Sequence, residues 1–208
     1  FMLLSGINFT QLIYLFRGKP ERLLRDEETR WYVSACLIAG VLLAAGLFVW
    51  TGQWDSIRLG LFTSISTITS TGFVASDYMA WPPVLWMVVF FLMFPGGASG
   101  STAGGMKWVR MAIFAKSARA EIQRRIHPNA VIPVRFNGRT MSETATSNIV
   151  AFMFFYVIII VLAALCFCGC GIGFDESLGV AVSMIGNVGV SIGQWGSSGC
   201  YAAFPPVA

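Results

Sequence analysis

Long apolar runs alternate along the chain with polar, basic or glycine-rich segments. The runs Tyr32–Trp50 and Asn148–Cys170 predict helices that cross a bilayer, because about 20 residues at a rise of about 1.5 Å each span the hydrocarbon core. Val84–Phe94 predicts the start of another crossing, and Phe1–Phe16 predicts the end of a helix. Asn148 is expected to cap the helix that it opens.

Two further stretches are too short to span a membrane. Ser56–Thr67 is a run of about 12 residues, roughly 18 Å as a helix, and Ser177–Ile185 is shorter still. Asp55 is expected to be the N-cap of the first. The segments Ser70–Phe73 and Asn187–Val190 follow them, and each contains a glycine. A glycine-broken segment at this place must face water, protein or ions, so both stretches predict re-entrant helices that end at an extended strand.

These two units form an internal repeat. Setting Gly72 against Gly189 aligns the units without a gap and pairs Ser66 with Ser183. Both copies enter the membrane from the same side. Parallel repeats related by an axis along the membrane normal suit a pore that lies on that axis.

The crossing that starts at Val84 is interrupted by Pro95–Gly105, which reads P-G-G-A-S-G-S-T-A-G-G. Glycine and proline cost a helix about 1 and about 3 kcal/mol relative to alanine, so no helix is expected there. Non-helical backbone at membrane depth must be buried or line a water-filled cavity, which favours a gate. Close helix packing through small residues and a phosphate-binding loop are the alternatives, although the G-K-[ST] ending of the latter is missing.

After this loop the sequence becomes basic. Lys107–Arg125 predicts a basic helix, and Asn129–Gly138 predicts a polar loop. Lys107 either reaches toward the pore or extends to the interface, as lysines at helix ends do. His127 is expected to be a solvated surface residue.

The composition indicates a membrane protein. Of the 208 residues, 56% are hydrophobic and 12% are charged, whereas soluble domains carry about 25% charged residues. The mean hydropathy is +0.70. The net charge of +4 does not indicate nucleic-acid binding, because the basic residues are confined to two segments.

The two basic segments set the topology. Of the 14 Lys and Arg residues, 13 lie in Arg17–Arg30 or Lys107–Arg139, and Arg58 is the exception. The positive-inside rule places both segments in the cytoplasm, so the short helices enter from outside. Acidic residues there give a mildly negative entrance that favours cations. They are Asp55, Asp77, Asp175 and Glu176.

Covalent chemistry is not indicated. The spans hold no His/Glu metal cluster and no Ser/His/Asp set, so the chain is not expected to be an enzyme. Cys166, Cys168 and Cys170 alternate, and this spacing points their side chains in different directions, which is poor geometry for a shared metal. A secondary transporter of a small solute is the competing class, but such folds often use inverted repeats.

The two glycine-containing segments, Ser70–Phe73 and Asn187–Val190, have the features of a cation selectivity filter. A dehydrated cation needs several oxygens at short range, and backbone carbonyls supply them where no side chain blocks the lumen. Gly72 and Gly189 permit the necessary backbone angles. Each short helix also ends at its strand, so its partial negative charge points at the ion. A closed ring needs about four strands, of which this chain has two.

The motifs together resemble the Trk/Ktr/HKT superfamily of potassium transporters. The resemblance lies in T-S-T-G-F at Thr69–Phe73, G-G-A-S-G-S-T-A-G-G-M-K at Gly96–Lys107, G-N-V-G at Gly186–Gly189, and R-D-E-E-T-R-W-Y before the first span. It implies an all-α transmembrane protein with a potassium-channel-like fold of repeated helix–re-entrant pore helix–helix units. The chain would then be a fragment of a four-repeat pore.

The resemblance also implies a division of the chain. Residues 1–30 would end the second-repeat inner helix and form a cytoplasmic connector, and 31–127 would be the third pore repeat with a broken inner helix. Residues 128–147 would be a second cytoplasmic connector. The fourth pore repeat, lacking its last helix, would occupy 148–208.

Site residues follow from the matching positions. The family often has proline after the fourth filter glycine, whereas this chain has Val190-Ser191. Potassium would bind at Thr71, Gly72, Val188 and Gly189. The implied filter residues are Ser70, Thr71, Gly72, Phe73, Asn187, Val188, Gly189 and Val190, and the implied gate residues are Gly96, Gly97, Ala98, Ser99, Gly100, Ser101, Thr102, Ala103, Gly104, Gly105 and Lys107.

The implied function is potassium uptake through a carbonyl-lined selectivity filter gated by the glycine-rich loop, in a multi-pass protein of the bacterial inner membrane. A sodium- and potassium-permeable transporter of the same superfamily is the alternative, and an ion-coupled solute transporter comes next. Potassium is the substrate and no covalent cofactor is expected. The implied partners are the lipid bilayer, a second copy in a homodimer and a cytosolic ring of nucleotide-binding regulatory subunits, with no nucleic acid.

Overall fold

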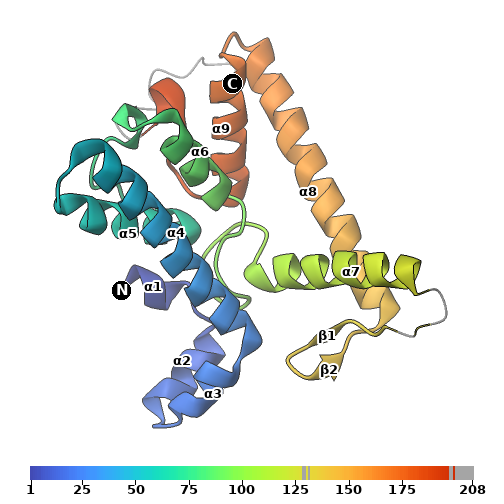
Figure 1. Cartoon of the computed structure of the whole chain (residues 1–208). Coiled ribbons are helices and arrows are strands. Elements are labelled where there is room, and N and C mark those ends of the chain that lie inside the picture. Colours follow the sequence, from blue (N-terminus) through green and yellow to red (C-terminus); the bar gives the residue numbers. More distant parts are fainter. Residues whose placement is uncertain (128–129, 131, 197–198, 200–208) are drawn as a thin grey trace.

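The regular secondary structure of the described residues consists of helices and one short β-hairpin (Figure 1). The computed structural model describes residues 1–127, 130, 132–196 and 199. Two long helices, α4 (Glu27–Thr51) and α8 (Glu143–Gly169), start at the same end of the molecule, and α5 (Asp55–Ile68) and α9 (Phe174–Gly186) turn back beside them. The other elements are α1 (Met2–Ser5), α2 (Phe9–Phe16), α3 (Pro20–Arg25), a 3₁₀ helix at Tyr78–Ala80, α6 (Pro83–Leu92), α7 (Trp108–Ile126), β1 (Arg135–Phe136), β2 (Arg139–Thr140) and a 3₁₀ helix at Gly193–Trp195.

The long helices α4 and α8 confirm the two predicted spans. Within the described residues, they are the helices long and apolar enough to cross a membrane. Both begin before their apolar run because a polar side chain caps them. Asp26 accepts a hydrogen bond from the Thr29 N–H at 2.9 Å, and Ser142 accepts one from the Ala145 N–H at 3.2 Å. Asn148 was therefore wrongly predicted as a cap, since it lies inside α8.

Small residues let α5 pack closely on α4. The Cβ of an alanine at Gly60 would lie 2.7 Å from Ala44 Cα and 3.0 Å from Ala44 Cβ. Further along the same crossing, the Ser64 hydroxyl donates to the Cys36 carbonyl at 3.1 Å. Both short helices were predicted within a few residues of their ends. The Asp55 cap was wrong, because Trp54 is the N-cap and Asp55 is the first helical residue.

The largest hydrophobic cluster joins the two halves of the chain. Leu43 of α4, Val89 of α6 and Val182 of α9 are fully buried in it. Tyr156 of α8 is buried in the same cluster. Val188, which follows α9, belongs to the same cluster. The core therefore holds the end of α9 against the helices of the first half.

The segment before α3 is not one helix, contrary to the prediction for Phe1–Phe16. It breaks between α1 and α2, and the Asn8 side chain caps α2 by accepting from the Thr10 N–H at 2.8 Å. The Gly6 carbonyl at the break accepts from the Ala98 N–H at 2.8 Å. Because a distant loop satisfies this carbonyl, the helix can end there without losing a hydrogen bond.

The predicted polar loop Asn129–Gly138 contains the turn of a β-hairpin. β1 and β2 pair antiparallel through Phe136 and Arg139, and the turn residues Asn137 and Gly138 have φ values of 49° and 74°. Asn-Gly favours such a two-residue turn, and this dipeptide was the missed signal. Residues 129 and 131 of the expected loop lie outside the described residues.

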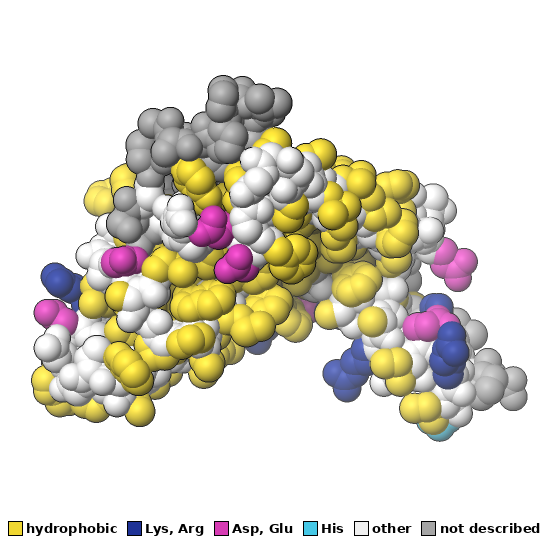
Figure 2. All heavy atoms as spheres, turned by 90° about the horizontal axis from the view of Figure 1, so that it is seen from above, with side chains coloured by type: hydrophobic (Ala, Val, Ile, Leu, Met, Phe, Trp, Pro, Cys, Tyr) yellow, Lys and Arg dark blue, Asp and Glu magenta, His cyan; other side chains and the backbone are white. Residues whose placement is uncertain are grey.

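Basic side chains are concentrated at one end of the molecule, whereas acidic side chains occur at both ends. Figure 2 looks onto the end where α8 stops and α9 starts, and acidic side chains lie there among apolar ones. Basic side chains gather on a projecting arm that carries the chain's single histidine and therefore the end of α7. This distribution agrees with the predicted topology, in which the basic segments are cytoplasmic.

The close crossing of α4 and α5 gives a first prediction. Gly60→Ala should destabilise the full-length protein by about 1–3 kcal/mol, because the added methyl group overlaps backbone atoms that cannot move without shifting a helix. Thermal unfolding of the detergent-solubilised protein measures the effect. Gly169→Ala is the control, since a Cβ there meets no atom within 4 Å. Equal melting temperatures for Gly60→Ala and the parent would contradict the packing described here.

Candidate functional site

The strand after α5 begins with a sharp reversal of the backbone. Ser70 and Gly72 have φ values of 53° and 72°, both left-handed, and Thr71 lies between them. The Thr71 N–H donates to the Ser66 carbonyl at 3.0 Å, which closes the last turn of α5 onto the strand. The end of the helix and the start of the strand therefore form one hydrogen-bonded unit.

The strand after α9 has the same backbone pattern in the same register. Asn187 and Gly189 have φ values of 54° and 93°, and the Val188 N–H donates to the Ser183 carbonyl at 2.9 Å. The Ser183 hydroxyl also accepts from the Gly189 N–H at 3.1 Å. Ser66 and Ser183 were paired by the sequence repeat, and their backbone carbonyls have the same role in the two copies. Their hydroxyls differ, since that of Ser66 donates to the Phe73 carbonyl at 2.7 Å.

The two strands lie against each other. A side chain at Gly72 would overlap the carbonyl oxygen of Val188, so only glycine allows the approach. The Tyr78 hydroxyl donates to the Ser191 carbonyl and ties the exit of the first strand to the second. Phe73 at the end of the first strand is 64% exposed. The predicted site segments are thus neighbours, although they are far apart in sequence.

Side-chain hydroxyls of α5 let this polar helix be buried. Thr67 donates to the Thr63 carbonyl at 2.8 Å, and Thr69 donates to the Ile65 carbonyl at 2.7 Å. The buried Ser70 hydroxyl has no hydrogen-bond partner among the described residues. One oxygen beside the strand is therefore available to a ligand.

The glycine-rich loop, which we define as Pro95–Gly105, is closed by its own backbone. The Met106 N–H donates to the Phe94 carbonyl at 2.9 Å, and the Trp108 N–H donates to the Gly97 carbonyl at 3.1 Å. A side chain at Gly96 would overlap the Gly104 carbonyl oxygen. The predicted interruption of the crossing is confirmed, since α6 ends before the loop and α7 begins after it.

The glycine-rich loop touches both the break before α2 and the second strand. The Phe9 N–H donates to the Gly100 carbonyl at 3.2 Å, next to the contact of Ala98 with Gly6 described above. On the other side, a side chain at Gly104 would overlap the carbonyl of Gly186, the last residue of α9. In Figure 1 the loop occupies the centre of the molecule, between α6 and α7.

Two charged side chains hold the glycine-rich loop. The Lys107 ammonium donates to the carbonyls of Ala103 at 2.6 Å and Ser101 at 3.2 Å, so it folds back over its own loop. Glu28 of α4 is buried at 6% exposure and accepts from the Ser99 N–H. Sequence reasoning missed Glu28. The available signal was an acid on a helix that enters a membrane, where such residues are costly and commonly functional.

Metal coordination by side chains has no support in the described part of the chain. No group of three or more His, Cys, Asp or Glu residues lies close enough there to hold an ion. Cys166, Cys168 and Cys170 are free. Any cation at the two strands would be held by backbone and hydroxyl oxygens, which are the hard ligands that potassium and similar ions prefer.

The fold and the site define a class of protein. Long membrane helices, half-length helices that end at paired glycine strands, and a glycine loop beside the strands together describe a transmembrane protein with pore-helix repeats. The family model "TrkH: Cation transport protein" matches residues 47–208. The chain belongs to this family.

Individual relatives agree with this assignment. The chain is 32% identical over 214 residues to the Trk system potassium uptake protein TrkI of Halomonas elongata, covering all of this chain and 43% of the relative. It is 32% identical over 203 residues to TrkG of Escherichia coli K12, covering 95% and 41%. The crystal structure of the potassium transporter TrkH from Vibrio parahaemolyticus superposes with a TM-score of 0.86 at 26% identity, over 93% of this chain and 42% of that one.

These comparisons confirm the family, the all-α pore-repeat fold and the membrane location. The chain spans about two fifths of the length of the curated relatives that it matches. The division of the chain into repeats at 30, 127 and 147 stays a prediction.

The contact between Glu28 and the glycine-rich loop gives a second prediction. Glu28→Ala should speed amide exchange in residues 95–107 by about tenfold or more, because a hydrogen bond to a charged group contributes about 1.5–3 kcal/mol. Hydrogen–deuterium exchange of the full-length protein measures this. Glu27→Ala is the matched control, since its carboxylate accepts from the hairpin residue Asn137 instead. Equal exchange of the loop in both variants would disprove the role of Glu28.

Proposed function

We propose that this chain forms two of the strands of a potassium selectivity filter in a potassium-uptake transporter. The observation that carries the proposal is the repeated backbone pattern at Ser70–Gly72 and Asn187–Gly189, each directly after a short helix. In each segment two left-handed residues flank one residue, Thr71 in the first and Val188 in the second. This alternation lets successive backbone carbonyls face the same side of the strand. A row of carbonyls on one side is what replaces the hydration shell of a potassium ion.

The nature of the relatives supports the choice of ion. The similar proteins TrkI and TrkG are potassium uptake proteins by name, and the matching family is one of cation transport. In this proposal Thr71, Gly72, Val188 and Gly189 contribute ion-binding oxygens. The C-terminal ends of α5 and α9 add partial negative charge at the strands. A pore that passes both sodium and potassium is the alternative, because the remaining strands would also set selectivity.

We further propose that the glycine-rich loop is the gate. Its position against Gly186, one residue before the second strand, supports this role. Besides its backbone hydrogen bonds, two charged side chains hold it, the Lys107 ammonium and the Glu28 carboxylate. A glycine loop held by a few polar contacts can change conformation without disrupting the helices around it.

The basic cytoplasmic elements suit the proposed partners. α7 is amphipathic, and its charged residues Arg119, Arg124 and Arg125 are exposed. We propose that this surface faces a cytosolic ring of nucleotide-binding regulatory subunits, and that the complete transporter is a homodimer in the bacterial inner membrane. Potassium is the transported substrate.

The filter proposal gives a third prediction. In the full-length protein, Gly72→Ser and Gly189→Ser should each reduce the preference for potassium over sodium by about tenfold, which corresponds to about 1.4 kcal/mol. The reason is that a side chain in left-handed backbone costs about 1–2 kcal/mol and shifts the carbonyls. Radioactive rubidium uptake with competing sodium measures the preference.

Gly171→Ser is the matched control for the filter variants. Gly171 has φ of 91° and no atom within 4 Å of an added Cβ, so the backbone strain is similar but lies away from the strands. An unchanged ion preference in both filter variants would overturn the filter proposal.

The gate proposal gives a fourth prediction. Lys107→Met should raise rubidium uptake severalfold at equal protein abundance, because the loop carbonyls of Ser101 and Ala103 lose their common donor. Deleting residues 99–102 should have a similar or larger effect. Lys116→Met is the control, since Lys116 donates to Glu27 and the Arg135 carbonyl rather than to the loop. Unchanged or reduced uptake by well-folded Lys107→Met protein would count against the gate.

A further inference from the structure

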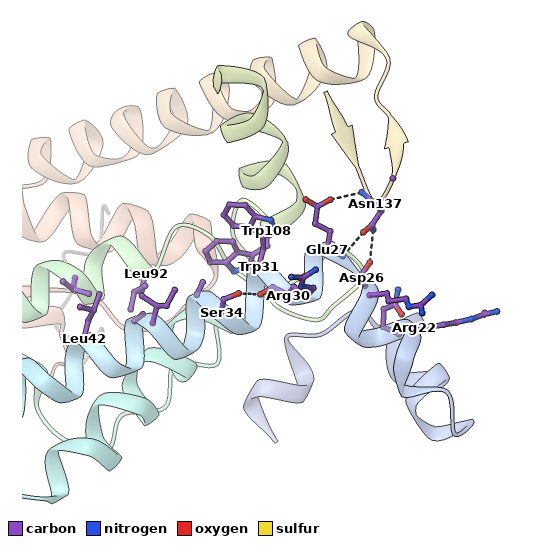
Figure 3. Close-up of a pocket in the computed structure, with 17 residues that line it drawn as sticks. Arg22, Asp26, Glu27, Arg30, Trp31, Ser34, Leu42, Leu92, Trp108 and Asn137 are labelled. Atoms are coloured by element: carbon purple, nitrogen blue, oxygen red, sulfur yellow. Dashed lines mark hydrogen bonds between the residues drawn. The ribbon is translucent and has the colours of Figure 1, made fainter. Parts of the chain in front are cut away.

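A groove of about 1050 Å³ runs along the outer side of α4, away from the paired strands. Figure 3 shows its wall, with α4 along its length and Trp108 and Asn137 reaching it from α7 and the hairpin turn. Its volume is sufficient for a ligand of several hundred daltons. Neither the proposed filter nor the proposed gate uses it.

The chemistry of the groove changes in steps from one end to the other. Figure 3 shows Arg22 at one end, Arg30 beside Trp31 and Trp108 in the middle, and Leu42 and Leu92 at the other end. From Arg30 to Leu42 the helix rises by about 18 Å. By the positive-inside rule the arginine end is cytoplasmic, so the order is charged, aromatic and apolar going into the membrane.

The charged end has uncompensated positive charge. Arg25 and Arg30 are exposed and line the groove, and neither has an ion pair within the described residues. Three arginines line this end, Arg22, Arg25 and Arg30, and the acid that remains to offset them is Asp26. Asp26 accepts from the Thr29 hydroxyl and the Asn137 amide, and Glu27 pairs with Lys116. The mouth of the groove therefore attracts an anion.

Two polar groups in the groove also lack partners. The indole Nε1 of Trp108 and the amide oxygen Oε1 of Gln11 are both buried, and neither has a hydrogen-bond partner among the described residues. Both residues line the groove. The Trp108 N–H is a donor, and a buried donor without a partner costs about 1–3 kcal/mol, so it favours a ligand with an acceptor oxygen. Gln11 Oε1 is an acceptor and would need a donor instead.

We propose that this groove binds an anionic phospholipid of the cytoplasmic leaflet. The phosphate of the lipid lies at Arg25 and Arg30, within reach of the Trp108 indole, and one acyl chain lies along Ile38, Leu42 and Leu92. Tryptophan at the boundary and apolar residues beyond it match the headgroup and hydrocarbon regions of a bilayer. A segment of folded protein would not require this graded order of charge, aromatic rings and apolar side chains along the membrane normal.

Lipid retention by the full-length transporter tests the proposal. The detergent-purified protein is incubated with an equimolar mixture of dioleoyl phosphatidylglycerol and dioleoyl phosphatidylcholine. Native mass spectrometry then counts the molecules of each lipid that stay bound. The parent should prefer phosphatidylglycerol. The double variant Arg25→Gln/Arg30→Gln should lose about 25-fold of this preference, since each arginine near an anionic headgroup contributes about fivefold. Arg119→Gln is the control, because it removes a cytoplasmic charge outside the groove.

A second variant separates a bound lipid from general surface attraction. Ala35 lines the groove beside Trp31, and Ala35→Phe fills the passage between its charged and apolar ends without changing any charge. Loss of bound phosphatidylglycerol in Ala35→Phe supports a lipid in the groove. The proposal is overturned if the parent shows no preference for phosphatidylglycerol, if the double arginine variant keeps the parent's preference, or if Ala35→Phe binds as much phosphatidylglycerol as the parent does. Because the readout is lipid binding, the outcome is independent of the proposed transport function.

Discussion

Non-helical backbone at membrane depth must find its hydrogen bonds within the protein, and this requirement determines how the centre of the molecule is built. The glycine-rich loop Pro95–Gly105 is not helical, so its backbone N–H and C=O groups do not have the hydrogen bonds that a helix would provide. Its N–H groups instead donate to a helix-break carbonyl at Gly6 and to a buried carboxylate at Glu28. Its carbonyls accept from the Lys107 ammonium. Each of these partners comes from a different element, so the loop fixes where those elements lie.

The start of α4 holds both the β-hairpin and the glycine-rich loop. Glu27 and Glu28 are consecutive in the first turn of α4 but face different neighbours. Glu27 accepts from Lys116 and from the Asn137 N–H of the hairpin turn, whereas Glu28 accepts from Ser99 of the loop. The hairpin turn and the glycine-rich loop are therefore anchored at consecutive residues of α4 by separate contacts.

Sequence patterns were sufficient for the elements that depend on local composition. Apolar length was enough to predict the two spans, and the repeat that pairs Ser66 with Ser183 matched two residues whose backbone carbonyls accept equivalent hydrogen bonds in the structure. The break at Gly6 was not predictable, because it depends on Ala98, which is distant in sequence. Glu28 was missed for the same reason, since a carboxylate in a polar first turn looks like ordinary helix-end chemistry until its loop partner is known. The Asn137–Gly138 turn could have been found from its dipeptide alone.

The two strands differ in a way that bears on how they are held in place. Ser70 and Asn187 adopt left-handed backbone without being glycine, a conformation that costs most residues about 1 kcal/mol or more. Asparagine tolerates it better than serine, and it is a common residue at the end of a helix. At the second position both strands have glycine, where Gly72 also needs the space because Val188 lies against it. The first left-handed residue of each strand can therefore vary with the helix cap. The second is fixed at Gly72 by the approach of the neighbouring strand, whereas Gly189 has no atom within 4 Å of an added Cβ and needs glycine only for its left-handed backbone.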